Sequence, residues 1–127
     1  MDTHAGRAGV LVVDDSEDLL DMLRRLIDRQ ADMRCVCVLE STVGLEDAIA
    51  EHSPDVAVVD LVGPGRDAIE GIRSASEKHP SCRIIAFSGH DDQDTIARAS
   101  DAGAWLLVSK HGDPAHLLEA IRAVMRE

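Results

Sequence analysis

Apolar runs of this sequence end in residues that can do ionic chemistry. The first run, GVLVV at positions 9–13, is followed at once by Asp14 and Asp15. Like charges repel, and charges beside a protein core are costly to desolvate. Three later runs end in further polar residues: Asp60, Ser88 with Gly89, and Lys110. Carboxylates that meet in one crevice can hold a cation, provided that one fold brings these run ends together.

The chain alternates between short apolar runs and longer amphipathic ones. These predict strands at 9–13, 33–40, 55–61, 82–89 and 104–110, and helices at 16–30, 42–53, 68–79, 91–103 and 113–127. We expect Ser16 and Asp113 to cap helices and Gly103 to end one. Short links and strands that are apolar throughout predict a doubly wound α/β fold, with a parallel sheet and helices on both faces.

The predicted fold would gather the polar run ends at one edge. In a parallel sheet the carboxyl ends of the strands form a common rim, and ligands bind there. Asp14, Asp15 and Asp60 would then converge, and three carboxylates in one crevice require a cation among them. Oxygen-only ligands favour Mg²⁺. In the alternative reading Asp14 and Asp15 only cap the next helix, but this leaves Asp60 and Lys110 unexplained.

Length and charge narrow the class of protein. The 127 residues fit one domain, which we place at 9–127 after a flexible lead-in at 1–8. The net charge of −11 argues against a nucleic-acid-binding surface. The sequence shows neither a signal peptide nor an apolar run of the roughly 20 residues that span a membrane. We therefore expect a cytoplasmic protein that contacts neither membrane nor nucleic acid.

The three cysteines predict neither a disulfide framework nor a metal site. Cys35 and Cys37 lie two residues apart in a predicted strand, which would place them on one face. A single C-x-C without a second pair is a weak metal signal. We interpret these residues as small buried hydrophobic side chains.

Taken together, the segments VVDDSED, DVAVVDL with Pro64 beyond it, IIAFSGHDD and GAWLLVSK resemble a known family. The chain is similar, over residues 9 to 126, to the receiver domains of two-component response regulators. The resemblance implies a flavodoxin-like receiver fold with strand order 2-1-3-4-5. No single segment is specific, but the set occurs in the right order at the right strand ends.

The resemblance also implies a role for each matching residue. Asp60 would be the phosphoacceptor, and Asp14, Asp15, Asp60 and the backbone carbonyl of Val62 would hold Mg²⁺. Ser88 would donate its hydroxyl to the phosphoryl group, Gly89 would leave room for that group, and Lys110 would pair with a phosphoryl oxygen.

Three positions depart from the family pattern. Ala68 stands where a glycine is usual, and His111 follows Lys110 where a proline with a cis bond is common. We leave the isomer of the 110–111 bond open. Leu107 replaces the aromatic residue that usually turns inward on phosphorylation. None of these departures removes a residue of the site.

The resemblance implies a signalling switch rather than an enzyme acting on other substrates. The partners would be a sensor histidine kinase or phosphotransfer protein, and a downstream effector protein or output domain. The output face would be the fourth helix, fifth strand and fifth helix, where Trp105 lies and where a homodimer can form.

Two other functions stay open as alternatives. The first is a degenerate receiver that binds partners without phosphorylation, against which the full set of site residues argues. The second is a phosphatase with an aspartate nucleophile. That chemistry usually needs an acid two residues after the nucleophile, and Val62 stands there. The glycine-rich signatures of nucleotide sites do not follow the first strand.

Overall fold

Five strands alternate with five helices in the computed structural model, which describes residues 6–61 and 68–127. The strands are β1 (Ala8–Val13), β2 (Met33–Leu39), β3 (Val56–Asp60), β4 (Arg83–Ser88) and β5 (Leu106–Ser109). The helices are α1 (Glu17–Asp28), α2 (Leu45–His52), α3 (Ala68–Lys78), α4 (Gln93–Ala102) and α5 (Pro114–Arg126). The predicted loop at 63–67 lies outside the described residues.

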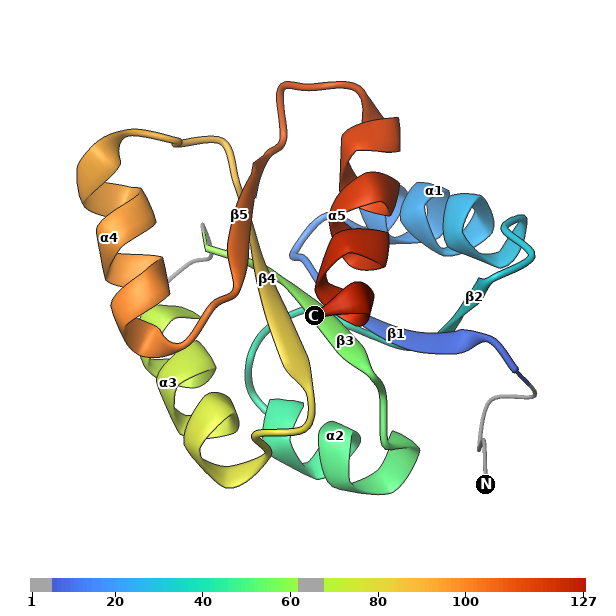
Figure 1. The fold of residues 1–127 in the computed structure, drawn as a ribbon, viewed down its shortest axis with the longest axis horizontal. Coiled ribbons are helices and arrows are strands. Elements are labelled where there is room, and N and C mark those ends of the chain that lie inside the picture. The colour runs from blue at the N-terminus through green and yellow to red at the C-terminus, as the bar shows by residue number, and fades with distance from the viewer. Residues whose placement is uncertain (1–5, 62–67) are drawn as a thin grey trace.

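The strands form one parallel sheet in the order β2-β1-β3-β4-β5 (Figure 1). This confirms the predicted fold and strand order. β2 pairs with one edge of β1, and the next strand in the chain, β3, pairs with the opposite edge of β1. The order therefore reverses between β1 and β3, and such a switch point is where doubly wound sheets bind ligands.

Helices cover both faces of the sheet (Figure 1). On one face α1 and α5 pack against Val10, Val12 and their neighbours. On the other face α2, α3 and α4 pack against Leu11, Val13 and the strand residues around them. Successive side chains of a strand point to opposite faces, so a central strand such as β1 must be apolar at every position. Because both faces of the sheet are buried, the carboxyl ends of its strands are held in fixed relative positions.

The helices begin and end largely where their caps predict. Ser16 caps α1 by accepting a hydrogen bond from the backbone of Leu19 at 3.2 Å, and Asp113 caps α5. Gly103 ends α4 with a φ of 120°, which side-chain-bearing residues rarely adopt. No helix in the described ranges is long and apolar enough to cross a membrane.

The predicted start of α2 at residue 42 was wrong. Residues before Leu45 form a turn, in which the Leu45 amide bonds the carbonyl of Thr42 at 3.0 Å. Gly44 has a φ of 84°, which a helix cannot accommodate, so α2 starts only after it.

The predicted lead-in at 1–8 is described only from residue 6. Ala8 already belongs to β1, one residue before the predicted strand start. The guanidinium of Arg7 donates to three carbonyls around the end of α1, those of Asp28, Gln30 and Met33. Arg7 is therefore tied to the fold.

The prediction that Cys35 and Cys37 share one face was wrong. The register of β1 with β2 shifts between Val10 and Leu11, so that Cys35 lies opposite Val10 and Cys37 opposite Leu11. Cys35 packs on the α1–α5 side and Cys37 on the α2–α4 side. The extra residue is a β-bulge, which inverts the alternation.

Cys35 and Cys37, which were predicted to be small buried hydrophobic side chains, are only half-buried, whereas Cys82 is buried. All three cysteines are free. Burial raises the pKa of Cys35 to about 11 and that of Cys82 to about 12, so both stay protonated at neutral pH. Metal binding requires the thiolate, which these surroundings disfavour.

The last strand is shorter than the predicted 104–110, and Trp105, which was predicted to lie within it, stands just before it. Its backbone amide donates to the carbonyl of Ile84 at 2.7 Å, which anchors the approach to β5. The guanidinium of Arg83 lies 5.1 Å from the centre of the indole ring. This cation–π contact holds one side of a side chain that is 45% exposed.

Candidate functional site

Three carboxylates meet at the carboxyl ends of β1 and β3. One oxygen from each of Asp14, Asp15 and Asp60 can be chosen so that all lie within 4.8 Å of one another. Val13 and Val59 are paired in the sheet, and this register places the residues that follow them side by side. Asp14 is 1% and Asp60 5% exposed, whereas Asp15 is exposed. Within the described ranges, no other group of acidic, histidine or cysteine side chains has this geometry.

Capping of α1 does not account for this acidic cluster. One oxygen of Asp14 accepts a hydrogen bond from the Ser16 amide at 2.9 Å, which shapes the turn into α1. Ser16 itself caps the helix. The second oxygen of Asp14 is directed to Lys110 instead, so this carboxylate links the turn to the interior of the rim.

Lys110 places its ammonium between two of the carboxylates. Its Nζ lies 2.8 Å from Oδ2 of Asp14 and 3.0 Å from Oδ1 of Asp60. Burial alone would lower the pKa of Lys110, but the hydrogen bonds to Asp14 and Asp60 outweigh it and hold this pKa above its ordinary value. The Nζ also lies 5.6 Å from the centre of the Phe87 ring. The ammonium therefore stays charged at neutral pH and offsets the repulsion inside the acidic cluster.

Ser88 and Gly89 lie on the same rim, at the end of β4. Ser88 is buried, and its Oγ accepts a hydrogen bond from the His90 amide at 2.9 Å. Its carbonyl accepts one from the Lys110 amide at 2.8 Å. A Cβ added to Gly89 would lie 3.5 Å from Nε2 of His111, which is ordinary contact. Gly89 thus faces the histidine that follows Lys110.

The remaining predicted residues lie away from the carboxylates or outside the described residues. Leu107 is half-buried and packs with the α2–α4 side of the core. Trp105 lies at the opposite end of β5 from Lys110. Val62, proposed to offer its carbonyl to the metal, and Pro64 lie outside the described residues. The described peptide bonds include no cis bond, so the 110–111 bond is trans.

His111 is a neighbour of the site that the sequence pattern did not predict. Nε2 of His111 lies 3.1 Å from the carbonyl oxygen of Gly89, although 22 residues separate them. Its position directly after Lys110 was the available signal. That position fixes its backbone near the rim, but it does not say where the ring points.

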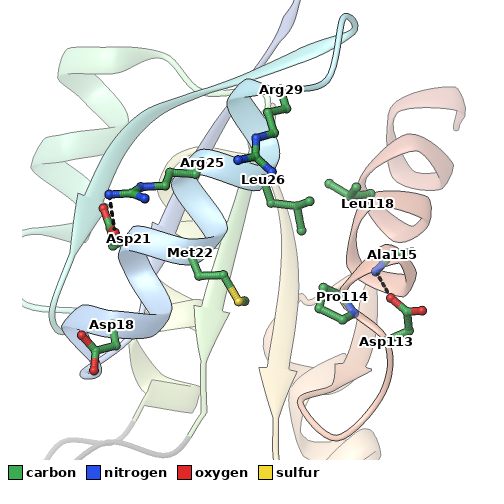
Figure 2. Close-up of a pocket in the computed structure, with 10 residues that line it drawn as sticks. All are labelled: Asp18, Asp21, Met22, Arg25, Leu26, Arg29, Asp113, Pro114, Ala115 and Leu118. Carbon is green, nitrogen blue, oxygen red and sulfur yellow. Dashed lines mark hydrogen bonds and ion pairs between the residues drawn. The ribbon is translucent and has the colours of Figure 1, made fainter.

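A groove of about 500 Å³ runs between α1 and α5 (Figure 2). Its lining combines apolar side chains with charged ones: Asp18, Asp21, Met22, Arg25, Leu26, Arg29, Asp113, Pro114, Ala115 and Leu118. None of the three clustered carboxylates contributes to it. The groove therefore adjoins the rim without being the place where the chemistry would occur.

The chemistry of the donor set fits a hard divalent cation. The cluster offers carboxylate oxygens, and Mg²⁺ prefers oxygen ligands supplied by one or two carboxylates together with water. The ammonium of Lys110 shows that a positive charge is favoured between Asp14 and Asp60. The acidic cluster is thus a site that could bind a metal ion.

The strand order and the acidic cluster at the carboxyl ends of β1 and β3 are those of a receiver domain. The model of the response regulator receiver domain matches residues 10–122, and the chain belongs to this family. The structure of a LuxR-family two-component response regulator from Aurantimonas sp. SI85-9A1 has a TM-score of 0.89 and 32% identity, covering 94% of this chain and 86% of that one.

Curated relatives extend the comparison. Chemotaxis protein CheY of Halobacterium salinarum is 28% identical over 91% of this chain and 95% of its own length. Protein-glutamate methylesterase/protein-glutamine glutaminase 5 of Myxococcus xanthus is 33% identical over 80% of this chain. The chain spans only 29% of the length of this methylesterase. It spans 49% of the transcriptional regulatory protein DegU of Brevibacillus brevis and 36% of the transcriptional activator protein ExaE of Pseudomonas putida. Receiver domains therefore occur among these relatives both alone and within longer proteins.

The pairing of Lys110 predicts a specific loss of stability in alkali. Because the pKa of Lys110 is raised in the folded state, its stabilisation is complete below the unfolded pKa of about 10.4. It is lost as pH rises through the folded value. The free energy of unfolding, measured with urea, should fall less between pH 9 and pH 11.5 for Lys110→Arg than for the wild type, because arginine stays charged.

Lys78 provides the matched control, since it is the other lysine of the chain. It pairs with Glu46 at the surface, where solvent screens the charges. Between pH 9 and pH 11.5, Lys78→Arg should therefore lose as much stability as the wild type. An equal loss in Lys110→Arg would contradict the inferred stabilisation.

Proposed function

We propose that this receiver domain is a phosphorylatable switch in which Asp60 accepts a phosphoryl group from a histidine kinase or phosphotransfer protein. The observation that carries the proposal is the ammonium of Lys110, 3.0 Å from Oδ1 of Asp60 inside a cluster of carboxylates. It supports the proposal because the carboxylate that would act as nucleophile has beside it a cation that could pair with the oxygens of an incoming phosphoryl group.

The residues of the chain divide the work of phosphoryl transfer. A carboxylate oxygen of Asp60 forms the new bond to phosphorus, and the bond from phosphorus to the donor breaks. Lys110 pairs with one phosphoryl oxygen and Ser88 donates its hydroxyl to another, which spreads the negative charge. Gly89 leaves space beside the group. The product is an acyl phosphate, which hydrolyses on its own, so the signal is temporary.

Asp14, Asp15 and Asp60 would hold Mg²⁺, together with the carbonyl of Val62. The ion would neutralise the repulsion between the carboxylates and the phosphoryl oxygens. In this proposal the domain catalyses only its own phosphorylation and dephosphorylation. The intact acidic set with Lys110 and Ser88 favours it over a degenerate receiver that acts without phosphorylation.

We propose that the signal leaves through the face formed by α4, β5 and α5. Large apolar side chains are exposed on two of these elements and just before β5: Ile96, Trp105 and Leu106. Apolar groups that stay in solvent are suited to a partner interface, which could be an effector protein, an output domain or a second copy of this chain. The net charge of −11 argues against direct binding of nucleic acid by this domain.

The acceptor assignment predicts a single, metal-dependent modification. Incubation with Mg²⁺ and acetyl phosphate should add one phosphoryl group, observed by intact-mass measurement. Asp60→Asn should remain unmodified, because an amide is a poor nucleophile. Modification of Asp60→Asn, or full modification in excess chelator, would contradict the assignment.

The metal assignment predicts that Mg²⁺ stabilises the fold. An ion that binds only the native state at 100 times its dissociation constant contributes about 2.7 kcal/mol, visible as a higher melting temperature. Asp15→Asn should weaken this response. It should also raise the stability of the metal-free protein slightly, because one of three clustered negative charges is removed. An unchanged melting temperature of the wild type at saturating Mg²⁺ counts against the site.

The output face predicts a fluorescence signal from the single tryptophan. Trp105 and Lys110 are five positions apart in the chain. This is roughly 16 Å along an extended chain, so the indole cannot touch a phosphoryl group. Addition of beryllofluoride, a phosphoryl mimic, should nevertheless shift its emission beyond the effect of Mg²⁺ alone, with Leu107 moving as a small inward side chain.

Asp60→Asn should abolish this additional shift, because it removes the carboxylate that holds the mimic. If emission stays constant while fluorine NMR shows bound beryllofluoride, then the signal does not pass Trp105.

A further inference from the structure

The ring of His111 joins two turns of the rim. It starts in the turn between β5 and α5, and its Nε2 reaches the carbonyl oxygen of Gly89 in the turn between β4 and α4 at 3.1 Å. A carbonyl can only accept, so Nε2 must carry the hydrogen of this bond. The ring therefore adds a side-chain link beyond the last residues of the sheet.

Backbone hydrogen bonds fix both ends of this link. The Lys110 amide donates to the carbonyl of Ser88 at 2.8 Å, which ties the ends of β4 and β5 together. The amide of His111 donates to Oγ of Ser109 at 3.1 Å, which sets the direction of the chain from which the ring projects. The histidine is thus held by a defined turn.

The link ends on the peptide unit that contacts the Ser88 hydroxyl. The carbonyl of Gly89 and the amide of His90 belong to one planar peptide group and point in opposite directions. His111 binds the carbonyl on one side, and the His90 amide donates to Oγ of Ser88 at 2.9 Å on the other. Rotation of this peptide would break both bonds at once. A donor on the carbonyl also polarises the amide and strengthens its own donation.

We propose that His111 is a positioning residue for Ser88. It acts through the 89–90 peptide and rests on the proposed function, in which Ser88 donates its hydroxyl to the phosphoryl group. Because Oγ accepts from the His90 amide, its place is fixed while its own hydrogen stays available for donation. Fixing the donor before the ligand arrives removes an ordering cost from binding. A proline at this position would provide no such ring donor.

The test compares beryllofluoride binding at saturating Mg²⁺ among His111 variants, with fluorine NMR detecting the bound fluorides. Loss of one hydrogen bond predicts roughly three- to tenfold weaker binding for His111→Ala. His111→Gln, whose amide nitrogen can occupy the place of Nε2, should bind within about twofold of the wild type. His111→Asn is the matched control, since its shorter amide cannot reach the carbonyl.

A double-mutant cycle separates positioning from general support of the fold. In a Ser88→Ala background, His111→Ala should cause no further loss of beryllofluoride binding. An equal loss in both backgrounds, or wild-type binding by His111→Ala, overturns the positioning role. Failure of the wild type itself to bind beryllofluoride overturns the acceptor function instead. Thermal melts confirm that each variant is folded.

Discussion

The repulsion between two nearly buried carboxylates is the constraint on which this site depends. Asp14 and Asp60 lie where water can scarcely reach them, so their charges must be balanced within the protein. Lys110 provides that balance, with Nζ 2.8 Å and 3.0 Å from their oxygens. The ammonium reaches this position only if the end of β5 lies level with the end of β4. The hydrogen bond from the Lys110 amide to the Ser88 carbonyl fixes this alignment. Sheet register and charge balance are therefore coupled.

Much of the fold and the convergence of the carboxylates could be predicted because both follow from simple periodicities. Apolar runs of strand length alternating with amphipathic helices permit few arrangements other than a parallel sheet covered on both faces. Once the sheet is parallel, the residues after Val13 and at Asp60 must share an edge. The strand order, in contrast, came from family resemblance, since the hydrophobic pattern alone does not say which strands are neighbours.

The differences from the sequence analysis arise where one residue changes the geometry. The extra residue in β2 separates Cys35 from Cys37 across the sheet, and a hydrophobic run carries no mark of such a shift. Gly44 delays α2 because of its backbone angle, not its polarity. The ring of His111 reaches Gly89 through a side-chain rotamer, which depends on the packed structure and not on spacing. Each of these is a local choice that tertiary contacts decide.

The bulge in β2 also affects how the edge of the sheet can pair with other chains. β2 and β5 are the two edges of the sheet, and a regular edge strand exposes unpaired backbone groups that can recruit another chain into a growing aggregate. The interrupted ladder of β2 makes it a poor template for such pairing, and β5 spans only Leu106–Ser109. Neither edge of the sheet therefore offers a long, uninterrupted strand with which a second copy of this chain could pair.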